Sequence, residues 1–142
     1  MIHFIVATHG PLAQALMASA NMVFGQLENT SCVCLTEEGG IEQFKRDFDQ
    51  EIRKVAPHFD GIVVLCDLEC GTPYNVACTY AFDREFETNV EVVTGVNFPT
   101  LLMTAEYVEE DDALVVAQKL HKEALSTIVI AELIDSTEED DF

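Results

Sequence analysis

Apolar residues along this chain form two alternating patterns: short runs, and longer stretches in which they recur every three or four positions. Short, mostly apolar runs are typical of strands buried on both faces of a sheet. They predict strands over residues 2–7, 31–35, 61–66, 90–94 and 127–133. The helical spacing predicts helices over residues 11–24, 41–56, 73–82 and 99–108, and a fifth that begins in the acidic cluster 109–112.

The regular alternation of strand and helix is typical of an α/β protein with a doubly wound, mostly parallel central sheet. Right-handed crossovers then place helices on both faces of that sheet. The last predicted strand, 127–133, follows a helix and precedes acidic residues, so we expect it to be an antiparallel edge strand or to be exchanged between two subunits. Residues 1–134 are expected to form one domain, and residues 135–142 a disordered acidic tail.

The net charge of the chain limits the classes of partner that it can bind. Seven basic and 26 acidic residues give a formal net charge of −19, which opposes binding to nucleic acid or to an anionic membrane surface. A basic protein partner is attracted by the same charge, although acidity also serves plain solubility. No apolar run reaches the roughly 20 residues that span a bilayer, so no membrane insertion is expected, and no basic leader opens the chain.

The cysteines indicate a reducing compartment. There are five, an odd number, and most lie in apolar, strand-like segments, so they are expected to be reduced core residues of a cytoplasmic protein. Cys32 and Cys34 are separated by one residue and lack a second cysteine pair or a histidine pair, which argues against a zinc site.

The candidate chemistry lies in three turns that each follow a predicted strand: Thr8-His9-Gly10-Pro11, residues 67–73 and residues 94–99. The carboxyl ends of parallel strands open on one rim of a sheet, where ligands collect. If strands 2–7 and 61–66 are neighbours, Asp67 comes within reach of His9. A carboxylate on one ring nitrogen fixes the imidazole tautomer and leaves the other lone pair exposed, as a nucleophilic histidine requires.

His9 is therefore the candidate phosphoryl acceptor and donor, and Asp67 the residue that orients its ring. Gly10, Gly71 and Thr72 lie where helices begin, and N–H groups at helix starts attract anions. We expect their N–H groups to hold the phosphoryl oxygens. Thr72 also suits the N-cap of the helix that follows. No metal or other cofactor is required, because the phosphoryl donor arrives already activated.

Together, the motifs Thr8-His9-Gly10, Asp67-Leu68-x-x-Gly71-Thr72-Pro73-Tyr74-Asn75 and Thr94-Gly95-Val96-Asn97-Phe98-Pro99 resemble the IIA component of the mannose class of the bacterial phosphoenolpyruvate:sugar phosphotransferase system. The similarity covers nearly the whole chain, in order. It implies a cytoplasmic phosphocarrier and a homodimer that exchanges the last strand. By position, His9 matches the phosphorylated histidine, Asp67 the aspartate that orients it, and Thr72 a hydroxyl residue of the family's Gly-Gly-Ser-Pro turn.

The resemblance also implies partners. The histidine accepts a phosphoryl group from phospho-HPr and passes it to a IIB protein, which serves a sugar permease. No IIB domain follows residue 142, so the acceptor is expected to be a separate chain. Two positions depart from the family's turn: Glu69 is charged where an apolar ring is frequent, and Cys70 replaces a glycine. A cysteine is costly there if the backbone requires a positive φ.

Three other functions stay open on the residues alone. A phosphocarrier subunit of a dihydroxyacetone kinase system is the nearest, although Gly10 and the Asp67 turn favour the sugar-transport branch. A cysteine enzyme would pair Cys70 with His9 and Asp67 on the same rim. A non-catalytic acidic module would bind basic partners and never become phosphorylated.

Overall fold

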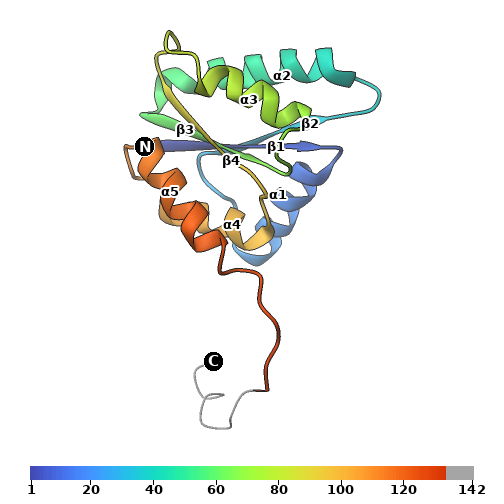
Figure 1. Ribbon diagram of the computed structural model, residues 1–142, viewed down its shortest axis with the longest axis vertical. Helices are drawn as coiled ribbons and strands as arrows, with labels where there is room; N and C mark the ends of the chain where they lie inside the picture. Colours follow the sequence, from blue (N-terminus) through green and yellow to red (C-terminus); the bar gives the residue numbers. More distant parts are fainter. Residues whose placement is uncertain (134–142) are drawn as a thin grey trace.

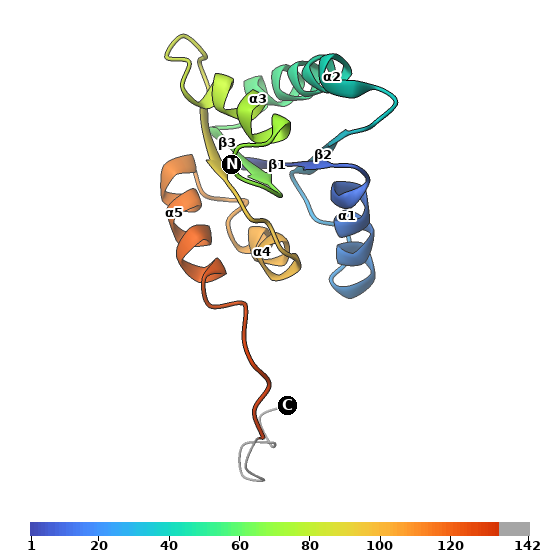
Figure 2. The same ribbon diagram turned by 45° about the vertical axis from the view of Figure 1, so that its right-hand side comes forward.

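The chain folds into three layers, with helices above and below a parallel sheet, in a computed structural model that describes residues 1–133 (Figure 1). The strands are β1 (Ile2–His9), β2 (Thr30–Leu35), β3 (Gly61–Cys66) and β4 (Asn89–Val93). The helices are α1 (Leu12–Val23), α2 (Gly40–Val55), α3 (Thr72–Ala81), α4 (Phe98–Met103) and α5 (Ala113–Ala124), with short 3-10 turns at Ala56–His58 and Thr104–Glu106. Helices α2 and α3 cover one face of the sheet, and α1, α4 and α5 cover the other (Figure 2).

Within the described residues the sheet has the strand order β2-β1-β3-β4, with all neighbours parallel. Ala7 of β1 lies opposite Cys66 of β3, and His9 lies opposite Leu35 of β2. The condition under which Asp67 reaches His9, that strands 2–7 and 61–66 are neighbours, is therefore met. From β1 the chain adds β2 on one side of the sheet, and it then adds β3 and β4 on the other side. The direction in which strands are added therefore switches between β1 and β3. Parallel sheets bind ligands outside the carboxyl ends of their strands at such a switch point.

Strands β1 and β3 are buried on both faces, which explains their continuous apolar runs. Side chains alternate across a strand, so Phe4 and Val6 enter the core beside α1, α4 and α5, whereas Ile5 and Ala7 enter the core beside α2 and α3. The apolar stripe of α2 is also as its spacing predicts, with these buried members: Phe44, Phe48, Ile52 and Val55. Packing on both faces thus fixes the position of the carboxyl ends of β1 and β3.

Some boundaries differ from the predicted ones. β1 extends to His9, two residues further than its apolar run, because it keeps pairing with β2. α4 ends at Met103, so the predicted helix over 99–108 is too long. The buried hydroxyl of Thr104 donates to the carbonyl of Leu101 there, and the chain tightens into a 3-10 turn. None of the helices in residues 1–133 combines the length and apolar character needed to cross a bilayer.

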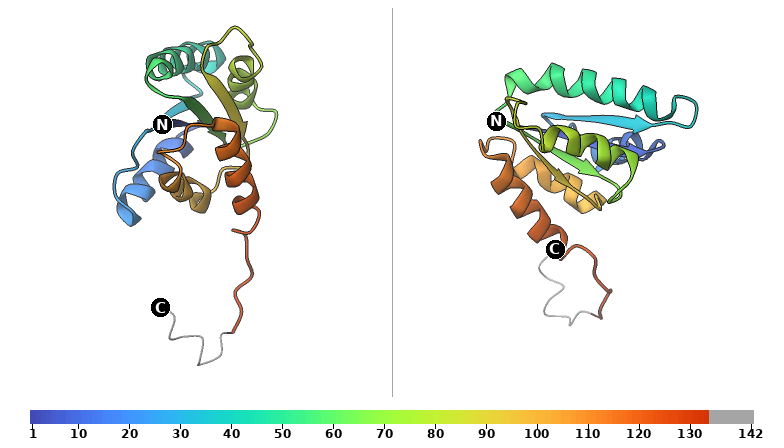
Figure 3. Two further views of the ribbon diagram at one scale, coloured as in Figure 1. Left: turned by 90° about the vertical axis from the view of Figure 1, so that its left-hand side faces the viewer. Right: turned by 45° about the horizontal axis from the view of Figure 1, so that its top comes forward.

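The prediction of a strand over 127–133 is wrong for the isolated chain. After α5 the chain leads away from the body without joining the sheet (Figure 3), and Ile128 and Ile130 are 87% and 90% exposed. A strand requires a neighbour for its backbone hydrogen bonds, and within the described residues this segment has none. Residues 128–133 are called the arm below. The predicted acidic tail, 135–142, lies outside the described residues.

Candidate functional site

His9 ends the central strand β1, and the chain turns from there into α1. Gly10 has φ +58°, in the left-handed region that favours glycine. The buried hydroxyl of Thr8 accepts a hydrogen bond from the N–H of Ala13 at 2.8 Å, so it satisfies one of the unpaired donors in the first turn of α1. Thr8 therefore fixes the start of α1 next to His9. This bond is absent from the sequence predictions, because the N-cap residue of α1 is Pro11 and Thr8 lies three residues before it, outside the position where a capping threonine is expected.

Asp67 directly follows β3 and holds His9 at two places. Its Oδ2 lies 3.0 Å from Nδ1 of the His9 ring and accepts the His9 backbone N–H at 3.1 Å. A carboxylate only accepts, so Nδ1 carries the proton and Nε2 keeps its lone pair. The His9 side chain is 42% exposed and that of Asp67 only 14%. The ring is thus open to a partner, while the group that orients it is shielded.

The start of α3 lies against the His9 ring. A Cβ atom on Gly71 would lie 2.6 Å from Cε1 and 3.1 Å from Nε2 of that ring, so a side chain at this position would displace the imidazole. The helix begins one residue earlier than predicted, with Gly71 as its N-cap and the N–H of Asn75 bonded to the Gly71 carbonyl. The prediction that Thr72 caps α3 is therefore wrong: Thr72 is the first helical residue, and no side-chain capping bond forms at this end.

The three predicted phosphoryl-binding donors are not equivalent. The N–H of Gly10 donates to the carbonyl of Leu35 at 2.7 Å, which extends the ladder between β1 and β2, so in this turn it is not a free donor. The first N–H groups of a helix have no partner within the helix. Thr72 contributes such a group at the start of α3, where the positive end of the helix dipole also attracts an anion.

The loop before Gly71 carries the two departures noted in the sequence. Cys70 has φ +64°, so the position does require the backbone conformation that disfavours a residue with a Cβ atom. Its Sγ lies 3.8 Å from Oε1 of Glu69, so its partner is a carboxylate, whereas a cysteine nucleophile needs a base such as the His9 ring. Burial raises the pKa of the Cys66 thiol, at the end of β3, to about 12. Neither thiol has the surroundings of a cysteine enzyme.

The third turn is joined to the second through the backbone. The N–H of Val96 donates to the carbonyl of Cys66 at 3.0 Å, immediately before Asp67. The side chain of Asn97 accepts the N–H of Thr100 at 3.0 Å and so caps α4. The three turns predicted to share one rim are therefore connected: the first to the second through His9 and Asp67, and the second to the third through Cys66 and Val96.

A cavity of about 400 Å³ opens beside this rim, between the start of α1 and the loop after β2. Gly10 contributes to its wall, and Glu37 and Glu38 give it an acidic lip. Among residues 1–133 no group of three histidine, cysteine or acidic side chains is arranged to hold a metal ion. Because Glu37 and Glu38 line this cavity, the surface next to His9 offers negative charge to a partner.

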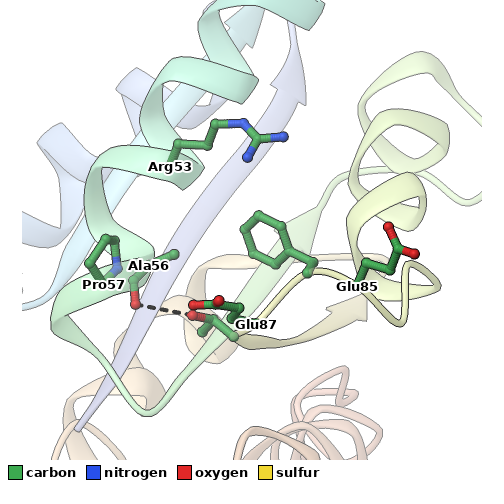
Figure 4. Close-up of a pocket in the computed structure, with 7 residues that line it drawn as sticks. Arg53, Ala56, Pro57, Glu85 and Glu87 are labelled. Carbon is green, nitrogen blue, oxygen red and sulfur yellow. Dashed lines mark hydrogen bonds between the residues drawn. The ribbon is translucent and has the colours of Figure 1, made fainter.

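A second cavity, of about 390 Å³, lies at the opposite end of the sheet, where strands β3 and β4 begin (Figure 4). Arg53 and Pro57, near the end of α2, form one wall, and the segment before β4, including Phe86, forms another. Arg53 donates to Asp49 at 2.8 Å, and its guanidinium carbon lies 5.7 Å from the centre of the Phe86 ring. His9 lies at the carboxyl end of the parallel strands, so this cavity at their amino ends is on the other side of the sheet's length. Its residues pack α2 against the connection from α3 to β4.

The fold and the site together define an α/β protein with a partly exposed histidine that contacts a shielded aspartate at the switch point of a parallel sheet. Residues 3–121 match the EIIA-man family, described as "PTS system fructose IIA component", and the chain belongs to this family. It is thus a IIA phosphocarrier component of a sugar phosphotransferase system. The fold class and the family resemblance drawn from the motifs are confirmed.

Two relatives agree with this assignment, and a solved structure agrees with the fold. The fructose-specific EIIA component of Bacillus subtilis (strain 168) is 30% identical over 102 residues, which cover 72% of this chain and 67% of that protein. The mannose-specific EIIAB component of Escherichia coli (strain K12) is 28% identical over 110 residues, 78% of this chain but only 33% of that protein. The crystal structure of phosphotransferase system component EIIA from Streptococcus agalactiae is similar in fold, with a TM-score of 0.81 at 21% identity, covering 92% of this chain and 97% of that one.

Proposed function

We propose that this protein carries a phosphoryl group on Nε2 of His9, between phospho-HPr as donor and a IIB component as acceptor. The observation that carries the proposal is the 3.0 Å contact between Nδ1 of His9 and the carboxylate of Asp67. It commits the ring proton to Nδ1 and leaves the lone pair of Nε2 for an incoming phosphorus atom. The partial exposure of the ring allows a protein donor to reach that nitrogen.

In the transfer step, a bond forms between Nε2 and phosphorus while the nitrogen–phosphorus bond of the donor breaks on the opposite side. The His9 ring gains positive charge as its second nitrogen becomes substituted, and Asp67 balances that charge through Nδ1–H. Transfer to the IIB protein reverses these changes. The donor supplies the activated group, so the residues of this chain need only orient the ring and stabilise the transferred oxygens.

The start of α3 is suited to stabilise those oxygens. The N–H groups of Gly71 and Thr72 lie at the positive end of the helix dipole, and the missing side chain of Gly71 lets the backbone approach the His9 ring. The Thr72 hydroxyl, which is not used as a cap, adds a further donor. Gly10 contributes the sharp turn after His9, because its N–H is bonded to Leu35.

Charge supports recognition by a donor with a basic face. The net charge of −19 attracts such a protein over a distance set by the ionic strength, and Glu37 and Glu38 place acidic groups beside the rim. Association with HPr is therefore expected to slow as salt is added. Because HPr and IIB proteins operate inside the cell, we place this protein in the cytoplasm.

We also propose a homodimer in which the arm of one chain pairs with β4 of the other. Within residues 1–133 β4 ends the sheet, so in this part of the chain one side of its backbone is open to a further strand. The arm presents apolar side chains to solvent, and Ile128, Ile130 and Leu133 are almost fully exposed. The arm has six residues and β4 has five, so an extended arm, at about 3.3 Å per residue, is long enough to pair along the whole of β4.

The test is incubation with phosphoenolpyruvate, enzyme I and HPr, followed by mass spectrometry. Wild-type protein is expected to gain about 80 Da, the mass of one phosphoryl group, in an acid-labile form. His9→Ala is expected to gain nothing, whereas His58→Ala, at an exposed histidine near the opposite edge of the sheet, gains as much as wild type. No mass gain in wild type, or a gain that persists in His9→Ala, refutes the proposal.

A further inference from the structure

The root of the arm is fixed by hydrogen bonds at the end of α5. Thr127 uses both its N–H and its hydroxyl on the carbonyl of Ala124, at 3.1 Å and 2.7 Å. Ser126 makes the same pair of bonds to the carbonyl of Glu123, at 3.2 Å and 2.8 Å. These bonds satisfy carbonyls that the last turn of a helix leaves without partners. The helix therefore stops at a defined residue, and the arm starts at a defined point.

Thr127 differs from Ser126 by one additional contact. Nδ2 of Asn97 donates to Oγ1 of Thr127 at 2.8 Å. Oδ1 of the same amide accepts the N–H and the hydroxyl of Thr100, at 3.0 Å and 2.5 Å. The orientation of the amide follows from this network, because its oxygen meets two donors and its nitrogen meets an acceptor. Asn97 therefore joins the start of α4 to the root of the arm.

This connection extends to the rim that carries His9. Val96, next to Asn97, donates its N–H to the carbonyl of Cys66, and the following residue, Asp67, holds the His9 ring. The third turn is consequently held on β3 by its backbone and on the arm by a side chain. A segment that docks on a partner loses conformational freedom, and fixing its root beforehand reduces that loss.

We infer that the hydrogen bond between Asn97 and Thr127 is a clamp that sets the direction in which the arm leaves the body, and that it strengthens the pairing of the arm with a second copy of this chain. The inference rests on the homodimer proposed above. The clamp holds only the root, so the apolar side chains of residues 128–133 stay available to the partner. Asn97 thus acts as a positioning residue for self-association.

The test compares two variants of the full-length chain. Thr127→Val keeps the shape of threonine but has no oxygen to accept the bond from Asn97. Ser126→Ala is the matched control, since it removes a hydroxyl bond of the same kind at the helix end without touching Asn97. Sedimentation equilibrium gives the dimer dissociation constant of each. Thr127→Val is expected to raise it about three- to tenfold, the scale of the cost of ordering one or two flexible groups at an interface, and Ser126→Ala to change it less than about twofold.

A double-mutant cycle separates the clamp from the helix-end bond. Asn97→Asp keeps an oxygen that caps α4 but loses the amide donor. If the two residues act together, adding Asn97→Asp to Thr127→Val raises the dissociation constant no further. Additive effects, equal effects of Thr127→Val and Ser126→Ala, or a wild-type chain that stays monomeric at every concentration overturn the inference.

Phosphorylation of His9 is measured on the same proteins, and Thr127→Val is expected to accept the phosphoryl group as wild type does. If the dimer loosens in Thr127→Val while wild type never becomes phosphorylated, the proposed function fails and the clamp stands. If His9 is phosphorylated and the dimer is indifferent to Thr127, the clamp fails and the proposed function stands.

Discussion

The carboxylate of Asp67 accepts two hydrogen bonds from His9, one from the ring at Nδ1 and one from the backbone N–H. The first sets the tautomer and the second fixes the end of β1, so one side chain determines both the state and the position of the ring. The two residues are 58 positions apart in sequence and meet because β1 and β3 are neighbours.

Asp67→Asn is expected to slow phosphorylation of His9 by about 10- to 100-fold, by comparison with the cost of losing a group that orients a metal-binding histidine. An amide can donate to Nδ1, which transfers the ring proton to Nε2, and it carries no charge to balance the phosphorylated ring. The initial rate of phosphoryl incorporation measures the effect, and the nitrogen chemical shifts of the ring report the tautomer. Asp111→Asn, at an exposed acidic residue, is the control. Equal rates for the two variants would contradict the role of Asp67.

Gly71→Ala is expected to impair transfer while leaving the fold intact. The backbone of Gly71 is extended, with φ −99°, which alanine adopts freely, but the new Cβ atom would lie 2.6 Å from Cε1 of His9. Gly95→Ala is the complementary control: its φ is +68° and nothing lies near its added Cβ atom, so it lowers the free energy of unfolding by about 1 kcal/mol and spares the ring. Chemical denaturation and phosphorylation rates separate the two effects. Normal transfer by Gly71→Ala would show that the ring does not need this space.

Cys70→Gly is expected to raise the free energy of unfolding by about 0.5–1 kcal/mol. Cys70 has φ +64°, and glycine relieves the clash of a Cβ atom in that region, although it adds some freedom to the unfolded chain. Cys70→Ala keeps the Cβ atom and should give no such gain. Urea unfolding of the three proteins measures the difference, and an equal stabilisation by alanine would point to the thiol instead of the backbone.

Acid is expected to destabilise the protein partly through His3. Its Nε2 lies 2.8 Å from the Ser31 hydroxyl, its Nδ1 has no partner among the described residues, and burial lowers its pKa from 6.5 to about 4 despite the attraction of Glu51. Between these pH values the unfolded chain binds a proton that the folded chain resists. The free energy of unfolding therefore falls as the pH drops from 6.5 towards 4, by up to roughly 3 kcal/mol.

Urea unfolding at several pH values from about 7 to 4 measures this contribution. His3→Gln should flatten the pH dependence of stability in that range, whereas His58→Gln, at an exposed residue, should not. Parallel curves for wild type and His3→Gln would assign the acid sensitivity to the carboxylates.

The parts of the fold and site that follow from sequence are those set by local chemistry. The apolar runs of β1 and β3, the stripe of α2, and the placement of His9 and Asp67 at the carboxyl ends of strands all depend on neighbouring residues. The bond from Gly10 to Leu35, the contact of Gly71 with the ring and the link from Asn97 to Thr127 depend on register and packing between distant segments. The strand over 127–133 was predicted from its apolar pattern, but the pattern cannot supply the neighbour that a strand requires.

The placement of β1 in the interior of the sheet has a consequence for partial unfolding. Edge strands and termini open most readily in native proteins, whereas strands flanked on both sides open last. β1 lies between β2 and β3, so fraying at β4 would leave the reactive imidazole and its carboxylate in register. The amide hydrogens of Ile5 and Val64 should accordingly be among the slowest to exchange with deuterium. His9 should keep its orientation when the edge strands unfold locally.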